Sequence, residues 1–162
     1  MRVIVAPDDF RTALAADGAV SLFLGGSIEQ GKAVNWQHDL LTCLKDQPFA
    51  HRLAVLNPRR PDWDASWPND PAFPPFREQV EWELAAQDQA AILLYYFAPG
   101  TVSPITLFEL GLYHARNPVI GADPDYTRFG NLSIACDKLN LPLHDGWDGF
   151  VEAVTTRISE LL

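Results

Sequence analysis

Residues 90–97, Ala-Ala-Ile-Leu-Leu-Tyr-Tyr-Phe, form an unbroken apolar run. Such a run, without alternation, predicts a strand that is buried on both faces, as the central strands of a parallel sheet are. The segment Ala98–Thr101 predicts a turn, and Ser103 followed by Pro104 predicts the start of a helix, with Ser at the N-cap and Pro in the first turn. A strand, a turn and a helix in this order favour an α/β fold.

The helix that begins at Ser103 is apolar on every side, and Glu109 is its only ionisable residue before Tyr113. An all-apolar helix predicts burial. A lone carboxylate in such a place costs several kcal/mol unless it is hydrogen-bonded or paired, so its presence points to a function. Glu109 is therefore the first candidate for chemistry, and a satisfied structural carboxylate is the alternative.

Strand-like and helix-like segments alternate along the rest of the chain. Strands are predicted at Arg2–Ala6, Val20–Leu24, Arg52–Leu56 and Val119–Ile120. Helices are predicted at Lys32–Leu44, from Pro74 or Pro75 to about Gln87, at Asn131–Leu139 and at about Gly149–Leu162. Long loops separate them at Asn57–Pro75 and Asp123–Gly130. We expect a single domain over residues 1–162, with a doubly wound, mostly parallel sheet of flavodoxin or Rossmann type and helices on both faces.

The composition and charge of the chain exclude some classes of binding partner. A formal net charge of −9 argues against a protein that binds duplex nucleic acid or an anionic membrane. No apolar run approaches the roughly 20 residues that a membrane span needs, and the N-terminus breaks off too early for a signal peptide. Cys43 and Cys136 lie far apart, and the four histidines lack metal-ligand spacing. We expect a cytoplasmic protein that acts on small molecules without a metal or cofactor.

The segment Gly26–Lys32 has the spacing of a phosphate-binding loop, with Gly, four residues, Gly and Lys. Ala33 replaces the Ser or Thr that should hold magnesium, and Glu29 would repel phosphates, so a nucleoside triphosphatase is disfavoured. The segment also lacks the final Gly of a nucleophile elbow around Ser27. Two interpretations stay open: a turn that lines a small-molecule site, and a turn whose glycines let the backbone approach a neighbour.

Ligands of open α/β sheets bind outside the carboxyl ends of the strands. Four segments lie at such ends: Gly25–Ser27, Asn57–Arg60, Ala98–Ser103 and Gly121–Gly130. Glu109 follows the third of them by less than two helical turns. It can reach the same crevice if its side of the helix faces inward.

Several of these segments together resemble the nucleoside 2-deoxyribosyltransferase-like family. The resemblance is carried by Leu22–Ile28, Asn57–Arg60 with Trp63 and Asp64, Gln79–Glu83, Ser103–Gly111 and Arg128–Asn131. Its most specific parts are Asn-Pro-Arg-Arg and the Glu-Leu-Gly after a buried strand. The family implies a five-stranded parallel sheet, a homo-oligomer, and cleavage or transfer at the N-glycosidic bond of a nucleoside or nucleotide derivative.

The resemblance implies that Glu109 is a nucleophile that forms a covalent glycosyl-enzyme intermediate. Family members that transfer deoxyribose carry an Asp six residues before this Glu, where this chain has Ser103. They carry a further acid in the preceding helix region, which handles the leaving base. The residues there are Gln79, Glu81, Glu83 and Asp88, which spacing does not rank. Glu83 and Asp88 are the catalytic candidates, although Asp88 is also explained as a helix-end residue.

The candidates for substrate binding are Gly25, Gly26, Ser27, Asn57, Arg59, Arg60, Trp63, Gln79, Ser103 and Asn131. Arg59 and Arg60 offer planar forks for an anion, or else form surface salt bridges. Trp63 offers a ring on which a base stacks, or else packs in the loop. Because Ser103 replaces an acid, the alternative function is a non-catalytic module that binds or senses a nucleotide derivative.

Overall fold

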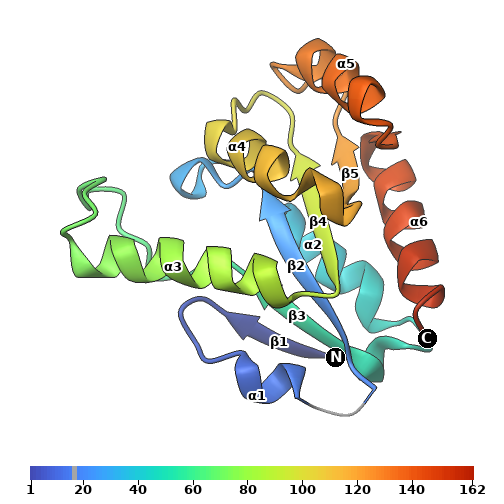
Figure 1. Ribbon diagram of the computed structural model, residues 1–162, viewed down its shortest axis with the longest axis horizontal. Coiled ribbons are helices and arrows are strands. Elements are labelled where there is room, and N and C mark those ends of the chain that lie inside the picture. Colours follow the sequence, from blue (N-terminus) through green and yellow to red (C-terminus); the bar gives the residue numbers. More distant parts are fainter. Residues whose placement is uncertain (16–17) are drawn as a thin grey trace.

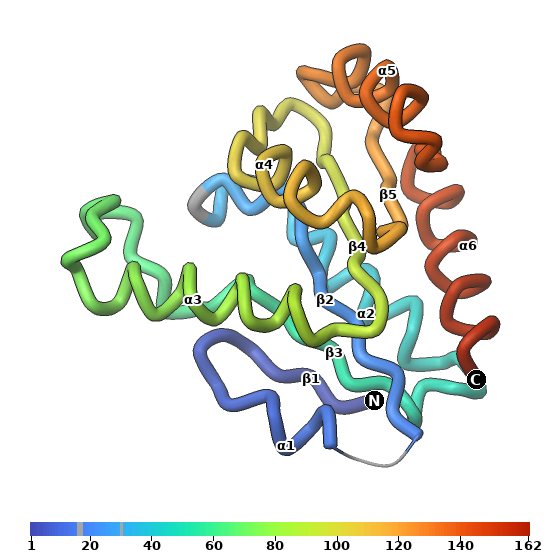
Figure 2. The backbone as a smooth tube through the Cα atoms, in the orientation of Figure 1, coloured from blue at the N-terminus to red at the C-terminus, as the bar shows by residue number. Residues whose placement is uncertain are grey.

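The computed structural model describes residues 1–15 and 18–162, which form one six-stranded sheet flanked by helices (Figures 1 and 2). Neighbouring strands are parallel in all five pairings, in the order β1-β3-β2-β4-β5-β6. The strands are β1 (Arg2–Val5), β2 (Val20–Gly26), β3 (Leu53–Asn57), β4 (Ile92–Phe97), β5 (Val119–Ala122) and β6 (Leu143–Asp145). The prediction of an α/β fold with a mostly parallel sheet is confirmed.

The expected number of five strands is wrong, because β6 adds a sixth. This strand has only three residues and pairs with β5 through Leu143 opposite Ile120. A segment of three residues between Pro142 and Gly146 is too short to show a strand periodicity in the sequence. The pairing of this segment with β5 places it in the sheet.

Helices cover both faces of the sheet. The helices are α1 (Arg11–Leu14), α2 (Trp36–Lys45), α3 (Pro74–Gln89), α4 (Pro104–Tyr113), α5 (Phe129–Leu139) and α6 (Gly146–Ser159). Helices α1, α3, α4 and α5 pack on one face, and α2 and α6 pack on the other (Figure 1). The sequence did not predict α1. Helix α2 starts later than the predicted Lys32, because the side chain of Asn35 accepts a hydrogen bond from the His38 amide and caps it.

Strand β4 is buried over its whole length, as its sequence predicts. Successive side chains of a strand point to opposite faces. Tyr95 therefore packs in the core under α3 and α4, whereas Tyr96 packs with Trp36 and Phe150 under α2 and α6. This difference decides which of the two tyrosines reaches the candidate site.

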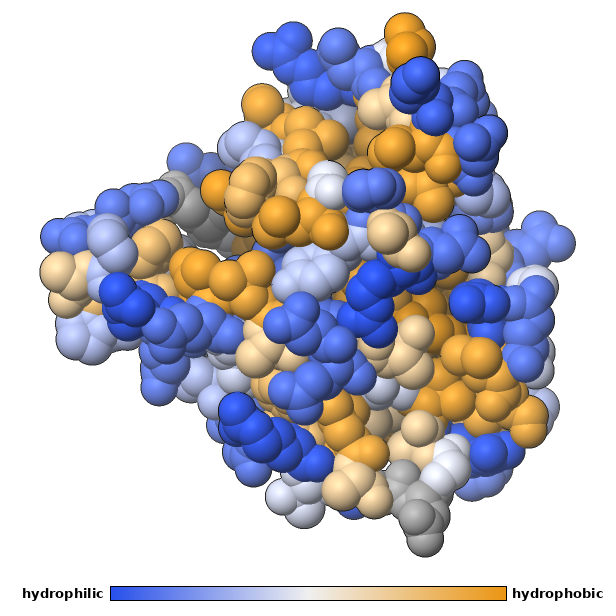
Figure 3. Space-filling view, viewed as in Figure 1, coloured by the Kyte–Doolittle hydropathy of each residue, from blue (hydrophilic) through white to orange (hydrophobic). Residues whose placement is uncertain are grey.

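Helix α4 starts at the predicted residue but is not buried on all sides. Thr106, Glu109 and Leu110 face the protein interior, whereas Ile105 and Phe108 are 62% and 64% exposed and Leu112 is 52% exposed. The prediction of an all-round buried helix is thus wrong for a single chain, because a helix outside a sheet has only one face against it. The apolar outer residues lie in the orange region over α4 in Figure 3.

The order of the strands changes direction between β2 and β4. The chain passes from β2 to β3 on one side and from β4 to β5 on the other. The carboxyl ends of β2 and β4 therefore face the crevice in which ligands of such sheets bind. The predicted long loop after β3 leads to Pro74, where α3 begins.

Candidate active site

Helix α3 presents a buried polar stripe toward α4. Gln79, Glu83 and Gln87 are spaced four residues apart and so share one side of the helix. Gln79 and Gln87 are buried, and Glu83 is partly buried. The Gln79 amide nitrogen donates to a Glu83 carboxylate oxygen (2.8 Å) and to the Pro58 carbonyl oxygen (2.9 Å). The stripe thereby connects α3 to the end of β3.

Glu109 lies opposite this stripe and is 8% exposed. Its Oε1 accepts a hydrogen bond of 2.9 Å from the amide nitrogen of Gln87. The same nitrogen donates to the Glu83 carbonyl oxygen at 3.3 Å, and the Gln87 amide oxygen accepts from the Tyr95 hydroxyl at 2.5 Å. Two helices and the central strand therefore converge on one carboxylate.

The two carboxyl groups titrate far above their ordinary range. Burial raises the pKa of Glu109 to about 7, although the hydrogen bond from Gln87 opposes the rise. Burial together with the charge of Glu109 raises the pKa of Glu83 to about 8, against the opposing hydrogen bond from Gln79. Glu109 is the first of the two to ionise. An ionised Glu109 beside a protonated Glu83 is the pairing that a nucleophile and an acid require.

Three hydroxyl groups form a hydrogen-bonded cluster just after the carboxyl ends of β2 and β4. The Ser27 hydroxyl lies 2.8 Å from that of Thr101 and 2.6 Å from that of Ser103, and it accepts a hydrogen bond from the Ala98 amide. All three side chains are buried. Ser27 and Ser103, which belong to two of the four segments predicted to lie at the carboxyl ends of the strands, are therefore in contact.

Glu29 takes the capping role that the sequence suggested for Ser103. Ser103 is in the left-handed region, with φ of 48°, and its side chain does not cap α4. Instead, Glu29 Oε1 accepts from the amides of Val102 and Ser103 at 3.0 and 2.8 Å. A carboxylate is favourable at the start of a helix, where amide groups point outward. The amides that a phosphate would need there already have an anionic partner.

Gly25 and Gly26 have a packing role. A Cβ at Gly25 would lie 2.6 Å from the Tyr95 ring, and one at Gly26 would lie 2.4 Å from the Tyr96 carbonyl oxygen. These distances are too short for any side chain. The structure therefore supports the interpretation in which the glycines let the backbone approach a neighbour, here the central strand.

The guanidinium group of Arg59 is bonded within the protein. Its two terminal nitrogens donate to the carbonyl oxygens of Gly31, Ala33 and Val34 at 3.0–3.2 Å, and to Gln37 Oε1 at 3.3 Å. Arg59 thus stabilises the turn before α2 by hydrogen bonds to its backbone. To bind an anionic substrate it would have to release these partners, so its geometry favours a structural role.

Arg60 also interacts with nearby residues of its own loop. Its side chain is 7% exposed, donates to both carboxylate oxygens of Asp62 at 2.7 and 2.8 Å, and lies over the Trp67 ring at 5.4 Å. Trp63 packs edge-on against Trp67, with ring centroids 5.1 Å apart. The local aromatic packing favours a structural role for both Arg60 and Trp63.

The remaining candidates lie apart from the carboxylate pair. Asp88 is exposed and accepts a hydrogen bond from the Tyr113 hydroxyl (3.0 Å), and Glu81 pairs with Arg77 on the surface. Asn131 is exposed on α5. Asn57 lies at the end of β3 and accepts from the Arg59 amide at 3.0 Å. Of the acids that spacing did not rank, Glu83 is the one whose pKa is raised by the charge of Glu109.

Sequence reasoning missed Gln87 and Tyr95. Gln87 continues the four-residue spacing of Gln79 and Glu83 along a predicted helix, and this signal was available. Tyr95 carried no such signal, because a Tyr inside an apolar strand is expected to be core. Its hydroxyl becomes significant only through its contact with Gln87.

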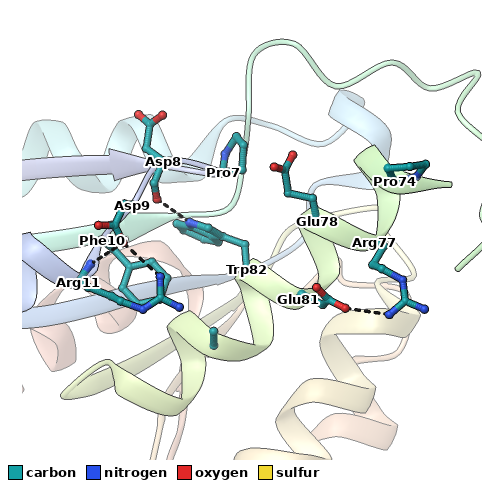
Figure 4. Close-up of a pocket in the computed structure, with 11 residues that line it drawn as sticks. Pro7, Asp8, Asp9, Phe10, Arg11, Pro74, Arg77, Glu78, Glu81 and Trp82 are labelled. Atoms are coloured by element: carbon teal, nitrogen blue, oxygen red, sulfur yellow. Dashed lines mark hydrogen bonds and ion pairs between the residues drawn. The ribbon is translucent and has the colours of Figure 1, made fainter. Parts of the chain in front are cut away.

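Two hollows of the surface lie away from the carboxyl groups of Glu83 and Glu109. A cleft of about 440 Å³ separates the loop after β1 from α3, and Trp82 forms part of its wall and donates to the Asp8 carbonyl oxygen (Figure 4). A second, of about 430 Å³, lies beside α6. Neither is lined by Glu83 or Glu109. The candidate site is therefore assigned from its chemistry and its position at the strand ends.

Residues 1–15 and 18–162 contain neither a metal-type cluster of side chains nor a membrane-spanning helix. Within these ranges, no group of three or more His, Cys, Asp or Glu side chains is arranged to hold a metal ion. None of the helices described there has the length and apolar character to cross a membrane.

The chain matches the sequence pattern of a known family. The family described as "Nucleoside 2-deoxyribosyltransferase like" matches residues 19–126. The matched range includes the α3 stripe, Tyr95 and Glu109. The chain belongs to the nucleoside 2-deoxyribosyltransferase-like family. The resemblance inferred from the sequence is confirmed.

A solved relative in fold is described as a crystal structure of a conserved protein from Enterococcus faecalis V583. It is 11% identical to this chain with a TM-score of 0.57, and the match covers 86% of this chain and 99% of that one. At this identity the likeness concerns the fold alone. No curated protein matches the chain.

Proposed function

We propose that this member of the nucleoside 2-deoxyribosyltransferase-like family is an enzyme that cleaves an N-glycosidic bond of a nucleoside or nucleotide derivative. The observation that supports this most is the pair of neighbouring acids, the buried Glu109 and the partly buried Glu83, whose surroundings raise both pKa values. Keeping two acids near each other and away from water destabilises a fold, so their presence favours a catalytic use.

In the proposed mechanism, Glu109 attacks the anomeric carbon of the sugar and forms a C–O ester bond. The C–N bond to the base breaks, its electron pair goes to the base, and the base takes a proton from Glu83. In the second step, water or a second base gives a proton to Glu83 and attacks the same carbon, which releases Glu109. Water gives hydrolysis, and a base gives transfer.

We infer that the substrate lies at the carboxyl ends of β2, β3 and β4. Asn57, Gln79 and Ser103 are the polar residues proposed to border it, because they lie at these strand ends or beside Glu83. Among the described residues, none provides a hydrogen bond to the buried Gln79 amide oxygen, so this oxygen is proposed as an acceptor for a base. We do not place an anionic group of the substrate at Arg59, because both of its terminal nitrogens already donate to carbonyl oxygens of the protein.

Incubation with a panel of nucleosides, nucleoside monophosphates and NAD tests this proposal. We expect chromatography to detect a released base from at least one nucleoside or nucleotide, and an exchanged nucleoside if a second base is added. The Glu109→Gln protein serves as the control for contaminating activities. Absence of turnover together with measurable binding would favour the alternative of a binding module, which the replacement of an acid by Ser103 suggests.

We also propose a homo-oligomer, in which the outer face of α4 meets a second copy. Ile105, Phe108 and Leu112 are exposed there and lie on the helix that carries Glu109. We expect light scattering at tens of micromolar to give a mass above the 18.0 kDa of one chain. Phe108→Asp should lower the mass, because it would bury a charge in the interface.

Val34→Asp is the matched control for this change. Val34 is also an exposed apolar residue, at 54%, but lies before α2. A wild-type protein with the mass of a monomer, or an equal response to both substitutions, would count against an interface at α4.

A further inference from the structure

The amide group of Gln87 has a single orientation that satisfies its neighbours. On one side lies the Glu83 carbonyl oxygen, which only accepts hydrogen bonds, and the amide nitrogen donates to it over a long distance of 3.3 Å. On the other side lies the Tyr95 hydroxyl, which donates to the amide oxygen at 2.5 Å. Gln87 and Tyr95 are both fully buried, so water does not compete for these groups.

This orientation determines whether Glu109 faces a hydrogen-bond donor or an acceptor of the Gln87 amide. With the amide nitrogen directed at it, Glu109 accepts a hydrogen bond on Oε1. Within the described residues, no other donor bonds to this carboxylate. Oε2 is therefore the oxygen that stays available. A flipped amide would instead direct its oxygen at the carboxylate, and the two acceptors would repel each other.

We propose that Tyr95 is a positioning residue, which fixes the amide of Gln87 so that Glu109 is held through Oε1 and presents Oε2 to the anomeric carbon. The inference rests on the proposed function for its catalytic meaning, whereas the orientation of the amide does not depend on it. Gly25 belongs to the same arrangement, because only a residue without a side chain leaves room for the Tyr95 ring.

The charged and titratable groups around Glu109 come from three elements. Glu83 faces it from α3 and Tyr95 from β4, and Tyr113 lies one turn further along α4. Arg116, just beyond α4, also acts on the two tyrosines. Burial raises the pKa of Tyr95 well above its ordinary value, so its hydroxyl remains a neutral donor at every pH used below.

Tyr95→Phe tests the proposal, and Tyr96→Phe is its matched control. Both remove one hydroxyl from adjacent residues of β4, but Tyr96 lies on the opposite face of the sheet. Tyr95→Phe should lower kcat about tenfold to a hundredfold, with KM changed less than about twofold, since a hydrogen bond to an ion is lost or misdirected. Gln87→Met should have a similar effect, because it removes the donor itself.

A second measurement does not need turnover. Carbon-13 NMR of labelled glutamate, with Glu109→Gln for assignment, follows the titration of Glu109 in each protein. Tyr95→Phe and Gln87→Met should raise the pKa of Glu109 by about one unit, because the ionised form loses its donor. Tyr96→Phe should leave it unchanged. These shifts in a protein that turns over no substrate would support the positioning but reject the proposed function.

Equal Glu109 titrations in Tyr95→Phe and Tyr96→Phe would overturn the role of Tyr95, whatever the activity. A loss of kcat in Tyr95→Phe without a change in that titration would do so as well, since the loss would then come from general damage. Melting temperatures of all variants identify a protein that has failed to fold. In that case the comparison of Gln87→Met with Tyr96→Phe decides whether the amide holds Glu109.

Discussion

Replacing Glu109 by Gln should abolish N-glycosidic cleavage, with a loss of turnover on the order of 10³-fold or more. An amide is a poor nucleophile, so the first step of the proposed mechanism fails. The fold should survive, because the oxygen of the new amide can still accept the hydrogen bond from Gln87. Turnover and melting temperature are measured on the same preparation.

The melting temperature of this variant also has an expected pH dependence. The pKa of Glu109 in the folded protein, about 7, lies above its ordinary value. Its contribution to stability is fully present below the ordinary pKa and is lost as the pH rises through 7. Glu109→Gln should therefore melt close to the wild type at pH 5 and above it at pH 8.5.

Glu81→Gln is the control, since Glu81 is an exposed glutamate of α3 that forms an ion pair with Arg77 on the surface. It should keep both activity and stability. Near-wild-type turnover in Glu109→Gln would show that Glu109 is not the nucleophile. Unfolding of Glu109→Gln at pH 5 would instead assign the carboxylate a structural role.

The main elements of the fold were predictable where the local signal is strong. The apolar run of β4 is long, and Ser103-Pro104 marks the start of α4. The strand β6 was not predictable, because three residues carry no period and its pairing with β5 decides its conformation. The exposed side of α4 was hidden for a related reason: an apolar helix does not indicate which of its sides meets the sheet.

The site was predictable only in part. Glu109 was identified because it is the lone carboxylate of an apolar helix. Glu83 could not be separated from Glu81 and Asp88, because the rotation of α3 about its axis relative to α4 decides which acid faces inward. Gln79, Glu83 and Gln87 share that inward side in the structure.

The arginines illustrate a different limit. Arg59 and Arg60 follow a strand, where an anion site was expected from the sequence. The carbonyl oxygens that occupy Arg59 belong to the turn Gly31–Val34, more than 20 residues away in sequence. Backbone acceptors carry no residue-type signal, so a sequence cannot show that a guanidinium group is already satisfied.

Replacing Glu83 by Gln should lower turnover by about 10²- to 10⁴-fold for bases that leave only when protonated. An amide does not transfer a proton to the departing base. A substrate whose base is already a good leaving group needs less help, so its turnover should fall much less. Glu81→Gln and Asp88→Asn should each change turnover by less than about twofold, since neither residue shares the buried stripe.

The pH profile of kcat/KM assigns the two roles in the same experiment. Wild-type activity should rise as Glu109 ionises, with a pKa of about 7, and fall as Glu83 loses its proton, with a pKa of about 8. The optimum is therefore narrow and lies between these values. In Glu83→Gln the alkaline fall should disappear, whereas the acid limb should stay near its wild-type position, because burial raises the pKa of Glu109 and Glu83 is already neutral where Glu109 ionises. A variant that keeps the full bell-shaped profile, or that loses equal activity on good and poor leaving groups, would mean that Glu83 does not protonate the base.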